Sequence, residues 1–464
     1  MIRRIKSMKL TFFGGAGILT GSNYLLEQNN SQDDEKFLVD CGLFQGSDYC
    51  ERKNFEPFSY SPKSIKAVFI THAHLDHIGR LPKLYRDGFR GKVFSTPPTK
   101  EFSRELLIDS ADILEREAKA KGLPKLYSIE DIDKLMNLWE EIDYHEKFNI
   151  GDLEVEFFDA GHILGSAFIA IKDHDKKIVF SGDLGNTPAP LINPTDSTVS
   201  LAADYAILES TYGGSIHQGK NKQKDILEDL IEDTVKNNGT LLIPAFAMER
   251  TQELLFELNE LVENRRIPRV PIFLDSPLAI KLTNLYQKYS YNQKYINQES
   301  LKIIRGGDEI FDFPGLRFCF EHKESEEIDK IKGSKIIIAG SGMMQGGRIM
   351  RHAYHFLPDK NSAILFVGYQ VKNSLGRQIL DGAKKVKIFG EEIPVNARVE
   401  FISSYSAHAD QNMLLNWLIP MRSNLKKVFI VHGEEEQIMS LNRRIKDELA
   451  IATSVPSIGE EIVI

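Results

Sequence analysis

Apolar and polar positions divide the chain into three parts with different rhythms. Up to about residue 209, short apolar runs alternate with turns rich in glycine, aspartate and asparagine, which predicts β-strands. The predicted strands cover 9–13, 23–26, 36–39, 67–70, 92–95, 154–158, 167–171, 177–180 and 205–208. The stretch from about 98 to 144 is instead rich in Glu, Lys and Leu, and it predicts one long helical interruption.

Between about 210 and 383 the pattern changes to alternating helices and strands. The segment 223–236 predicts an amphipathic helix, because its apolar residues share one face: Ile226, Leu227, Leu230, Ile231 and Val235. Further strands are predicted at 240–243, 270–274, 335–339 and 363–367, and a further helix at 251–261. This alternation is typical of a parallel α/β sheet. The last part, about 384–464, returns to strands with two helices.

The composition is that of an ordinary globular protein, with 42% hydrophobic and 27% charged residues among 464. This length suits two or three domains, and no run approaches the ~18 apolar residues of a membrane span. Three cysteines without C-x-x-C spacing fit a reducing cytoplasm and are expected in the core. A net charge of −8 argues against a uniformly basic nucleic-acid coat protein. It allows a nucleic-acid enzyme, because bound metal ions add positive charge that the composition omits.

Histidines are concentrated in one short stretch, Thr71-His-Ala-His-Leu-Asp-His77. The predicted strand 67–70 precedes it, so these side chains lie on a turn where ligands two and four residues apart can converge. Imidazole nitrogens with a carboxylate suit Zn²⁺, and less selectively Mn²⁺ or Fe²⁺. A solvated polar turn would explain any one of these histidines, but the whole cluster favours a metal site.

Three more candidate ligands follow predicted strands on glycine-containing turns: His162, Asp183 and His432. Loops at the carboxyl ends of strands converge and often carry chemistry. A single histidine or aspartate at such a position is more often structural, so the inference depends on the set. With His72, His74, Asp76 and His77, they form a ligand set large enough for two ions.

In this order, these residues resemble the metal ligands of the metallo-β-lactamase superfamily. Asp40, within Phe37-Leu-Val-Asp-Cys-Gly42, matches the first, outer acid of that family. The resemblance implies an α/β fold, an αββα sandwich with two metal ions at one edge. One ion would be held by His72, His74 and His162, and the other by Asp76, His77 and His432, with Asp183 bridging. A histidine at position 74 favours two Zn²⁺ ions over two irons, with Mn²⁺ as a substitute.

The middle part resembles the β-CASP insert of superfamily members that cleave nucleic acids, a Rossmann-like parallel α/β domain. The matching motifs are Leu208-Glu-Ser-Thr-Tyr212, Pro244-Ala-Phe-Ala-Met-Glu-Arg250, Asp275-Ser-Pro-Leu278, Gly340-Ser-Gly-Met-Met344, Gly368-Tyr-Gln370, Ser406-Ala-His-Ala-Asp410 and His432-Gly-Glu434. The resemblance covers essentially the whole chain and is nearest to compact prokaryotic relatives of the endonuclease subunit of the pre-mRNA 3′-end cleavage complex. It predicts a metallo-β-lactamase domain formed by 1–209 and 384–464, with the insert at 210–383.

This resemblance implies a zinc-dependent phosphodiesterase that cleaves single-stranded RNA with a metal-activated hydroxide. The expected catalytic residues are Asp76, His408, Glu209 and Asp40. His408 would give a proton to the departing 3′-oxygen, and Glu209 would hold the other ring nitrogen and keep the ring charged near pH 7. The alternative is a structural role for His408, as a cap or core residue before the helix predicted at 411–417.

A grip for the substrate phosphate is expected at Ser341 and Gly342, where amides at a predicted helix start and the Ser341 hydroxyl could bind an anion. Tyr369 and Arg250 are further candidates, although a surface salt bridge explains Arg250 equally well. His352 and His355 are explained at least as well by packing on their helix.

Several alternatives stay open. A DNA nuclease of the same insert class is disfavoured, because such members tend to carry an apolar residue where this chain has His432. A catalytically silent paralogue would have lost ligands, and a small-molecule hydrolase would not need so large an insert. The chain lacks the N-terminal appendage and the extra C-terminal domain of ribonuclease J, which favours endonuclease over 5′→3′ exonuclease action. The expected partners are single-stranded RNA and no membrane, with a homodimer left open.

Overall fold

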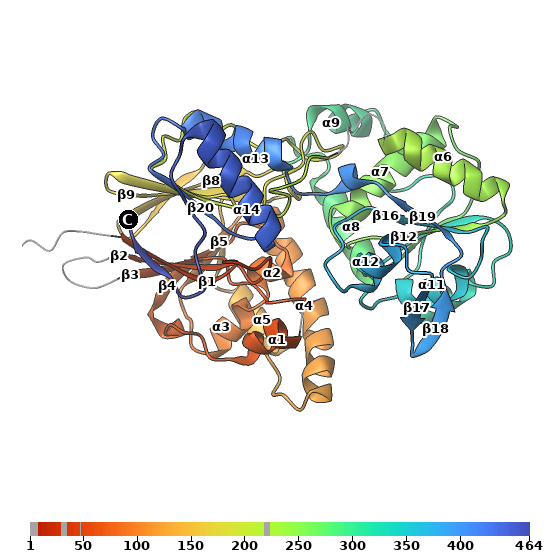
Figure 1. The fold of residues 1–464 in the computed structure, drawn as a ribbon, viewed down its shortest axis with the longest axis horizontal. Helices are drawn as coiled ribbons and strands as arrows, with labels where there is room; N and C mark the ends of the chain where they lie inside the picture. Colours follow the sequence, from red (N-terminus) through yellow and green to blue (C-terminus); the bar gives the residue numbers. More distant parts are fainter. Residues whose placement is uncertain (1–7, 29–34, 47, 218–222) are drawn as a thin grey trace, which may run out of the picture. The chain divides into compact units, whose positions relative to one another are not determined.

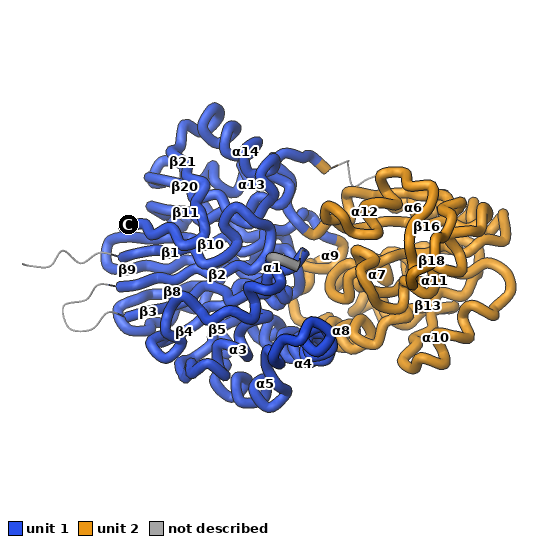
Figure 2. The backbone as a smooth tube through the Cα atoms, turned by 60° about the horizontal axis from the view of Figure 1, so that its bottom comes forward, with its two compact units in different colours: residues 1–189, 194–216, 408–464 blue, residues 190–193, 217–407 orange. Residues whose placement is uncertain are grey.

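The chain forms two compact units in the computed structural model, which describes residues 8–28, 35–46, 48–217 and 223–464 (Figure 1). Unit 1 comprises 1–189, 194–216 and 408–464, and unit 2 comprises 190–193 and 217–407 (Figure 2). The chain leaves unit 1 near the expected position but returns at 408 rather than at 384. The reason is β19 (Arg398–Phe401), which pairs in parallel with β16 (Ala363–Phe366) of unit 2.

Unit 1 contains two facing sheets. The first sheet is formed, in spatial order, by β22 (Glu461–Val463), β1 (Met8–Gly14), β2 (Asn23–Gln28), β3 (Glu35–Val39), β4 (Ile65–Phe69), β5 (Lys92–Ser95) and β6 (Trp139–Glu141). The second is formed by β21 (Thr453–Ser454), β20 (Lys427–Ile430), β11 (Tyr205–Leu208), β10 (Lys176–Phe180), β9 (Ala167–Asp173), β8 (Leu153–Asp159) and β7 (Lys147–Ile150).

Helices cover the outer face of each sheet in unit 1 (Figure 1). On the first sheet lie α1 (Asp48–Arg52), α2 (Leu75–Ile78), α3 (Leu81–Arg86), α4 (Pro97–Ala120) and α5 (Ile129–Met136). On the second lie α13 (Gln411–Leu418) and α14 (Glu435–Arg444). This arrangement confirms the expected αββα sandwich.

Separate hydrophobic clusters fill the spaces between the layers of unit 1. In β4, Phe69 faces the cluster between the two sheets, whereas its neighbour Val68 faces the cluster beneath α3, α4 and α5. This alternation follows from the two-residue period of a strand. A further cluster, which includes Trp417 and Leu441, joins the second sheet to α13 and α14. The loops at the strand ends are therefore held on a packed frame.

The predicted helical interruption at 98–144 is not one helix. α4 ends at Ala120, just before Gly122, whose φ of +64° lies in the left-handed region that ends helices. A capping box of Ser128 and Asp131 then begins α5. The remainder forms β6, which pairs in parallel with β5. Composition alone identified the helices but did not locate the break or the edge strand.

Unit 2 has the expected parallel α/β sheet. Its strand order is β14 (Leu316–Phe318), β13 (Ile272–Asp275), β15 (Lys335–Ala339), β12 (Thr240–Pro244), β16 and β19, and every pairing is parallel. The helices are α6 (Gln223–Lys236), α7 (Arg250–Glu263), α8 (Pro277–Tyr289), α9 (Gln298–Arg305), α10 (His322–Ile328), α11 (Ile349–Phe356) and α12 (Leu375–Leu380). A hairpin of β17 (Lys385–Ile388) and β18 (Glu391–Pro394) lies outside this sheet.

Within the described ranges, none of the helices has the length and apolar character needed to cross a membrane. All three cysteines are free thiols.

The buried side of α7 carries polar residues. Arg250 forms an ion pair with Glu253 and donates to the carbonyl oxygen of Tyr405. The Tyr405 hydroxyl donates to Glu257, which also accepts from Gln223 at 2.6 Å. Burial raises the pKa of Glu257 to about 7, although both hydrogen bonds oppose the shift. Glu257 is therefore protonated in the folded protein at mildly acidic pH.

We expect this carboxyl to make the protein less stable as pH rises from about 5 to about 7. The unfolded chain loses the proton near 4.5 and the folded protein near 7, so the folded state holds more protons in this window and its stability falls as pH rises. The full shift corresponds to about 3 kcal/mol in the free energy of unfolding. Glu257→Gln keeps the shape and should flatten this slope in denaturant unfolding. Equal slopes in both proteins would assign the pH dependence to another group.

Candidate metal centre

Strand ends of unit 1 bring the predicted site residues to one edge of the sandwich. Each of six residues lies shortly after the end of a strand: Asp40 after β3, His72 after β4, His162 after β8, Asp183 after β10, Glu209 after β11 and His432 after β20. β3 and β4 are parallel, as are β10, β11 and β20. β8 runs in the same direction as β10, because both are antiparallel to β9. The sequence prediction that loops at the strand ends converge here is consistent with this geometry.

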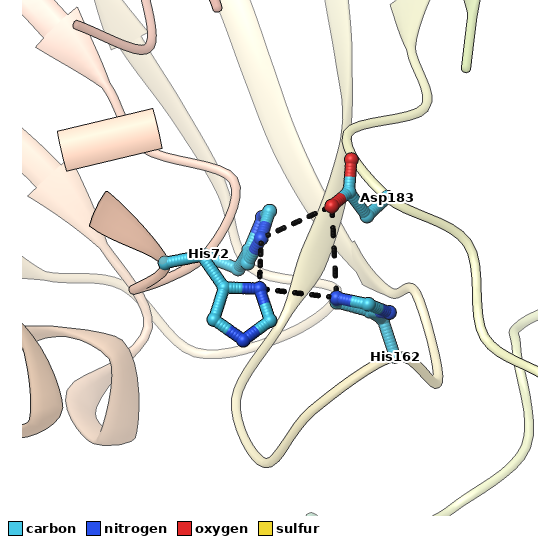
Figure 3. A group of neighbouring side chains, drawn as sticks. His72, His162 and Asp183 are labelled. Carbon is cyan, nitrogen blue, oxygen red and sulfur yellow. Dashed lines mark hydrogen bonds and ion pairs between the residues drawn. The ribbon is translucent and has the colours of Figure 1, made fainter. Parts of the chain in front are cut away.

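The first group of ligand atoms contains three imidazoles and one carboxylate. His74 Nδ1 lies 3.0 Å from His72 Nε2 and 3.3 Å from His162 Nε2. Asp183 Oδ2 lies 3.4 Å from His72 Nε2 and 3.6 Å from His162 Nε2. Figure 3 shows the side chains of His72, His162 and Asp183 directed at one another.

These imidazoles are neutral in the folded protein. Burial lowers the pKa of both His72 and the partly exposed His74 to about 3. Burial, reinforced by nearby His408, holds the pKa of His162 well below its ordinary value. A neutral imidazole is the form that binds a metal ion, because one ring nitrogen then keeps its lone pair.

The second group is formed by Asp76, His77 and His432. Asp183 Oδ1 lies 3.4 Å from His77 Nε2 and 3.5 Å from His432 Nε2. Asp76 Oδ2 lies 3.9 Å and 3.8 Å from the same two nitrogens. The two carboxylate oxygens of Asp183 therefore face one group each, which is the arrangement of a bridging ligand.

Unsatisfied polar atoms support a metal-binding role. His77 Nε2 and Asp183 Oδ1 are buried and have no hydrogen-bond partner within the described part of the chain. Burying such atoms without a partner is costly, and native proteins rarely do so without a ligand or ion. Both groups bring their donor atoms within 4.8 Å of one another. The residues therefore fit metal ions, and their imidazole and carboxylate donors are those that Zn²⁺ accepts.

Asp40 fixes the orientation of His77. Its Oδ2 lies 2.8 Å from His77 Nδ1, and its two oxygens accept from the backbone amide and the hydroxyl of Thr71. Burial acts to lower the pKa of His77, but the carboxylates of Asp183 and Asp40 outweigh it and raise this pKa well above the ordinary value. Asp40 thus has the position of the outer acid that the sequence suggested.

Three hydroxyl residues that support the ligands were missed in the sequence. Thr71 contacts the Nδ1 atoms of both His72 and His77, at 3.1 Å and 3.4 Å. Ser166 Oγ accepts a hydrogen bond from the backbone amide of His162 at 3.1 Å. Ser22 lies 3.1 Å from His432 Nδ1. Thr71 and Ser166 stand close to motif residues, so their position was a usable signal. Ser22 has no such signal, because it is 410 residues from its partner.

His408 lies beside these ligands with Glu209 behind it. His408 Nδ1 is 3.4 Å from Glu209 Oε1, and the Glu209 carboxylate accepts from the backbone amides of Leu184 and Thr211. Burial lowers the pKa of His408, but Glu209 and Asp183 more than compensate and raise it. The cap of α13 is Asp410, whose side chain accepts from Met413 N. The helix-cap explanation for His408 is therefore not needed.

The predicted phosphate contacts all lie in unit 2, where the helix expected to include 348–356 forms, but its start does not lie at Ser341 or Gly342. α11 begins at Ile349, and the Ser341 hydroxyl instead accepts from the amide of Gln345 within the preceding loop, at 3.0 Å. Gln370 donates to the carbonyl oxygens of Gly342 and Gly368, so this loop lies beside the segment that carries Tyr369.

Arg250 was expected on the surface or on a phosphate, but its side chain is buried against Glu253 and Tyr405. His352 is also occupied within the fold, since its two ring nitrogens lie 2.7 Å from Asp275 and 2.9 Å from Asp329. Neither side chain is placed to receive a substrate without breaking these contacts.

Comparisons with known proteins agree with this architecture. The chain matches the Metallo-beta-lactamase superfamily over 16–232, the Beta-Casp domain over 251–379 and the Zn-dependent metallo-hydrolase RNA specificity domain over 392–456. Ribonuclease TTHA0252 of Thermus thermophilus is 36% identical over 94% of this chain and 95% of its own length. Transcription termination factor FttA of Methanosarcina mazei is 31% identical over 96% of this chain and 70% of its own length.

A crystal structure of a protein of unknown function from Enterococcus faecalis V583 has the same fold, with a TM-score of 0.56 and 14% identity. The match covers 99% of this chain and 100% of the Enterococcus faecalis chain. Given the domain matches and the relative that aligns over 95% of its own length, this chain belongs to the β-CASP ribonuclease family of the metallo-β-lactamase superfamily, a family of hydrolytic nucleases.

Proposed function

We propose that this protein is a zinc-dependent endoribonuclease that cleaves single-stranded RNA and holds two Zn²⁺ ions per chain, with Mn²⁺ as a substitute. The main support is Asp183, whose two oxygens face two separate groups of nitrogen and carboxylate donors. RNA as substrate is supported by the similarity to Ribonuclease TTHA0252 and by the match to an RNA specificity domain. Free cysteines fit a reducing compartment such as the cytoplasm.

Each ligand has a defined task in this proposal. One ion would be held by His72, His74 and His162. The other ion would be held by Asp76, His77 and His432, and Asp183 would contact both ions. When bound, the ions would neutralise charge on the scissile phosphate and make water more acidic. Asp40 and Thr71 hold the imidazole of His77 in a fixed orientation. Ser341, Gly342 and Tyr369 are the proposed phosphate contacts, whereas Arg250 is assigned to the fold of unit 2.

His408 is the proposed proton donor to the departing 3′-oxygen. Its Nδ1 lies 3.4 Å from Glu209 Oε1, and the proposal assigns the proton transfer to the other ring nitrogen, Nε2. Glu209 is fixed by two backbone amides and would stabilise the imidazolium before transfer. His408, Asp183 and Glu209 also form a group of possible ligands, but the proposal assigns His408 to the substrate.

The test is incubation of the zinc-loaded protein with single-stranded RNA labelled at the 5′ end or the 3′ end. With either label, an endonuclease gives discrete labelled fragments that run from the labelled end to an internal cut position. A 5′→3′ exonuclease, the second candidate, gives only mononucleotides from the 5′ label. A matched DNA strand distinguishes a deoxyribonuclease. Zinc-loaded protein that cleaves none of these strands would refute the proposed function.

We expect RNA binding to depend on salt although the chain is acidic overall. Each phosphate contacted by the protein should contribute about −0.7 to the slope of log affinity against log salt concentration for a single strand. Fluorescence anisotropy with a labelled oligonucleotide and the His408→Ala variant, whose turnover should be much slower, would measure this slope. An affinity independent of salt would show that the protein does not contact the phosphates.

A further inference from the structure

The two histidines of the second metal group have different contacts at Nδ1, the ring nitrogen that faces away from the ligand group. His77 Nδ1 lies 2.8 Å from a carboxylate oxygen of Asp40. His432 Nδ1 lies instead 3.1 Å from the hydroxyl of Ser22. The other nitrogen of His432 faces the ligand group, 3.5 Å from Asp183 and 3.8 Å from Asp76. Ser22 is thus the side chain that determines how His432 presents this nitrogen.

The direction of the hydrogen bonds follows from this geometry. His432 Nε2 can bind a cation only with its lone pair, so the ring proton must be on Nδ1, where it is donated to Ser22 Oγ. The proton of Ser22 is then available to a second acceptor. The hydroxyl of Tyr24 is the neighbouring acceptor, since a Cβ atom built at Gly15 would lie 2.6 Å from it and 3.1 Å from Ser22 Oγ. The tautomer of His432 is therefore coupled to two hydroxyl groups in series.

Both hydroxyl residues are enclosed by the fold. Ser22 has no exposed surface, and Tyr24 is 5% exposed, with its ring against Phe12 and Phe180. A cavity of about 10 Å³ beside them is lined by Ser22, Tyr24, Asp40, Thr71, His77 and His432. It has room for about one water molecule. Bulk solvent therefore does not compete for His432 Nδ1.

Gly15 fixes the same cluster from the first sheet. A Cβ atom at this position would lie 2.6 Å from the Tyr24 hydroxyl and 3.1 Å from Ser22 Oγ. The carbonyl oxygen of Gly15 also accepts a hydrogen bond from the backbone amide of His432, at 2.6 Å. The turn after β1 thus makes room for the two hydroxyls and holds the backbone of the histidine that they orient.

We propose that Ser22 and Tyr24 are positioning residues of the second metal position, which fix the tautomer and ring orientation of His432. This inference rests on the proposed two-ion site. Loss of a group that hydrogen-bonds the non-ligating nitrogen of a metal-bound histidine typically lowers metal affinity by about 10–100-fold. Ser22→Ala should lower the affinity for one of the two ions by this factor and leave the affinity for the other ion unchanged. Tyr24→Phe should have a smaller effect in the same direction, because Ser22 remains.

The experiment is a titration of metal-free protein with Zn²⁺ in competition with a chelator, followed by Co²⁺ titration in which absorption reports each site. Ser110 and Tyr127 provide a matched control, since they form a buried Ser–Tyr hydrogen bond in unit 1 and are absent from the ligand groups. Ser110→Ala and Tyr127→Phe should bind both ions like the parent protein. Ser22→Thr, which keeps the hydroxyl, should restore most of the affinity.

A double-mutant cycle separates positioning from general destabilisation. If Ser22 acts through His432, adding Ser22→Ala to His432→Ala should cause no further loss of affinity. Parent-like binding by Ser22→Ala, or full additivity in the cycle, would overturn the inference. The proposed ligand set itself would fail in a different way, because His432→Ala would then bind two ions as tightly as the parent.

Discussion

The double substitution His72→Ala, His74→Ala should remove one metal ion and RNA cleavage together. The two side chains provide two of the three imidazoles in the first group, where His72 Nε2 and His74 Nδ1 lie 3.0 Å apart. A lost ligand contact lowers affinity by about 10–100-fold or more, so two losses at one position should exceed what micromolar zinc can compensate. Metal content by mass spectrometry and cleavage of labelled RNA are the two measurements. Activity should fall to background because both ions act on the same phosphate.

His322→Ala is the matched control for this experiment. His322 is exposed on unit 2 and pairs with Glu326, and it belongs to neither ligand group. Its zinc content and activity should equal those of the parent. Thermal unfolding of the double variant without added metal should resemble that of metal-free parent protein. A double variant that retains the full zinc content of the parent would refute the assigned ligands.

The structure brings together the residues that the sequence proposed as metal ligands, whereas it divides the chain at other positions than the sequence suggested. Thr71-His-Ala-His-Leu-Asp-His77 places its ligands on one turn, so short-range spacing carried most of the information. His162, Asp183 and His432 were recognisable because each follows an apolar run that became β8, β10 or β20. Local pattern is sufficient where the ligand immediately follows its strand.

Long-range contacts were the part that the pattern could not provide. The strand Arg398-Val-Glu-Phe401 alternates charged and apolar residues, a pattern that does not indicate which sheet it joins. It pairs with β16 of unit 2, and unit 2 therefore extends to 407. Arg250 looked exposed in the sequence because arginine usually is, but Glu253 and the Tyr405 carbonyl compensate its burial. Both outcomes depend on partners that only the folded chain brings together.

The second large effect is expected for His408→Ala, which should keep its metal and bind RNA nearly normally while turnover falls by about 10²–10⁴. The reason is that His408 lies beside the ligands with Nδ1 on Glu209 and would act only when the 3′-oxygen departs. The decisive measurement compares an ordinary RNA with an analogue in which sulfur replaces the scissile 3′-oxygen. A thiolate leaves without needing a proton, so the loss caused by His408→Ala should shrink on the sulfur analogue.

Glu209→Gln is the companion variant, because it keeps the side-chain length and changes only the charge behind the imidazole. It should show the same preference for the sulfur analogue in a milder form, since Glu209 orients His408 and stabilises its charged form without giving up a proton itself. Zinc content in both variants should match the parent, which separates this role from that of the ligands. Equal impairment of His408→Ala on the oxygen and sulfur substrates would instead assign His408 to the support of the metal site.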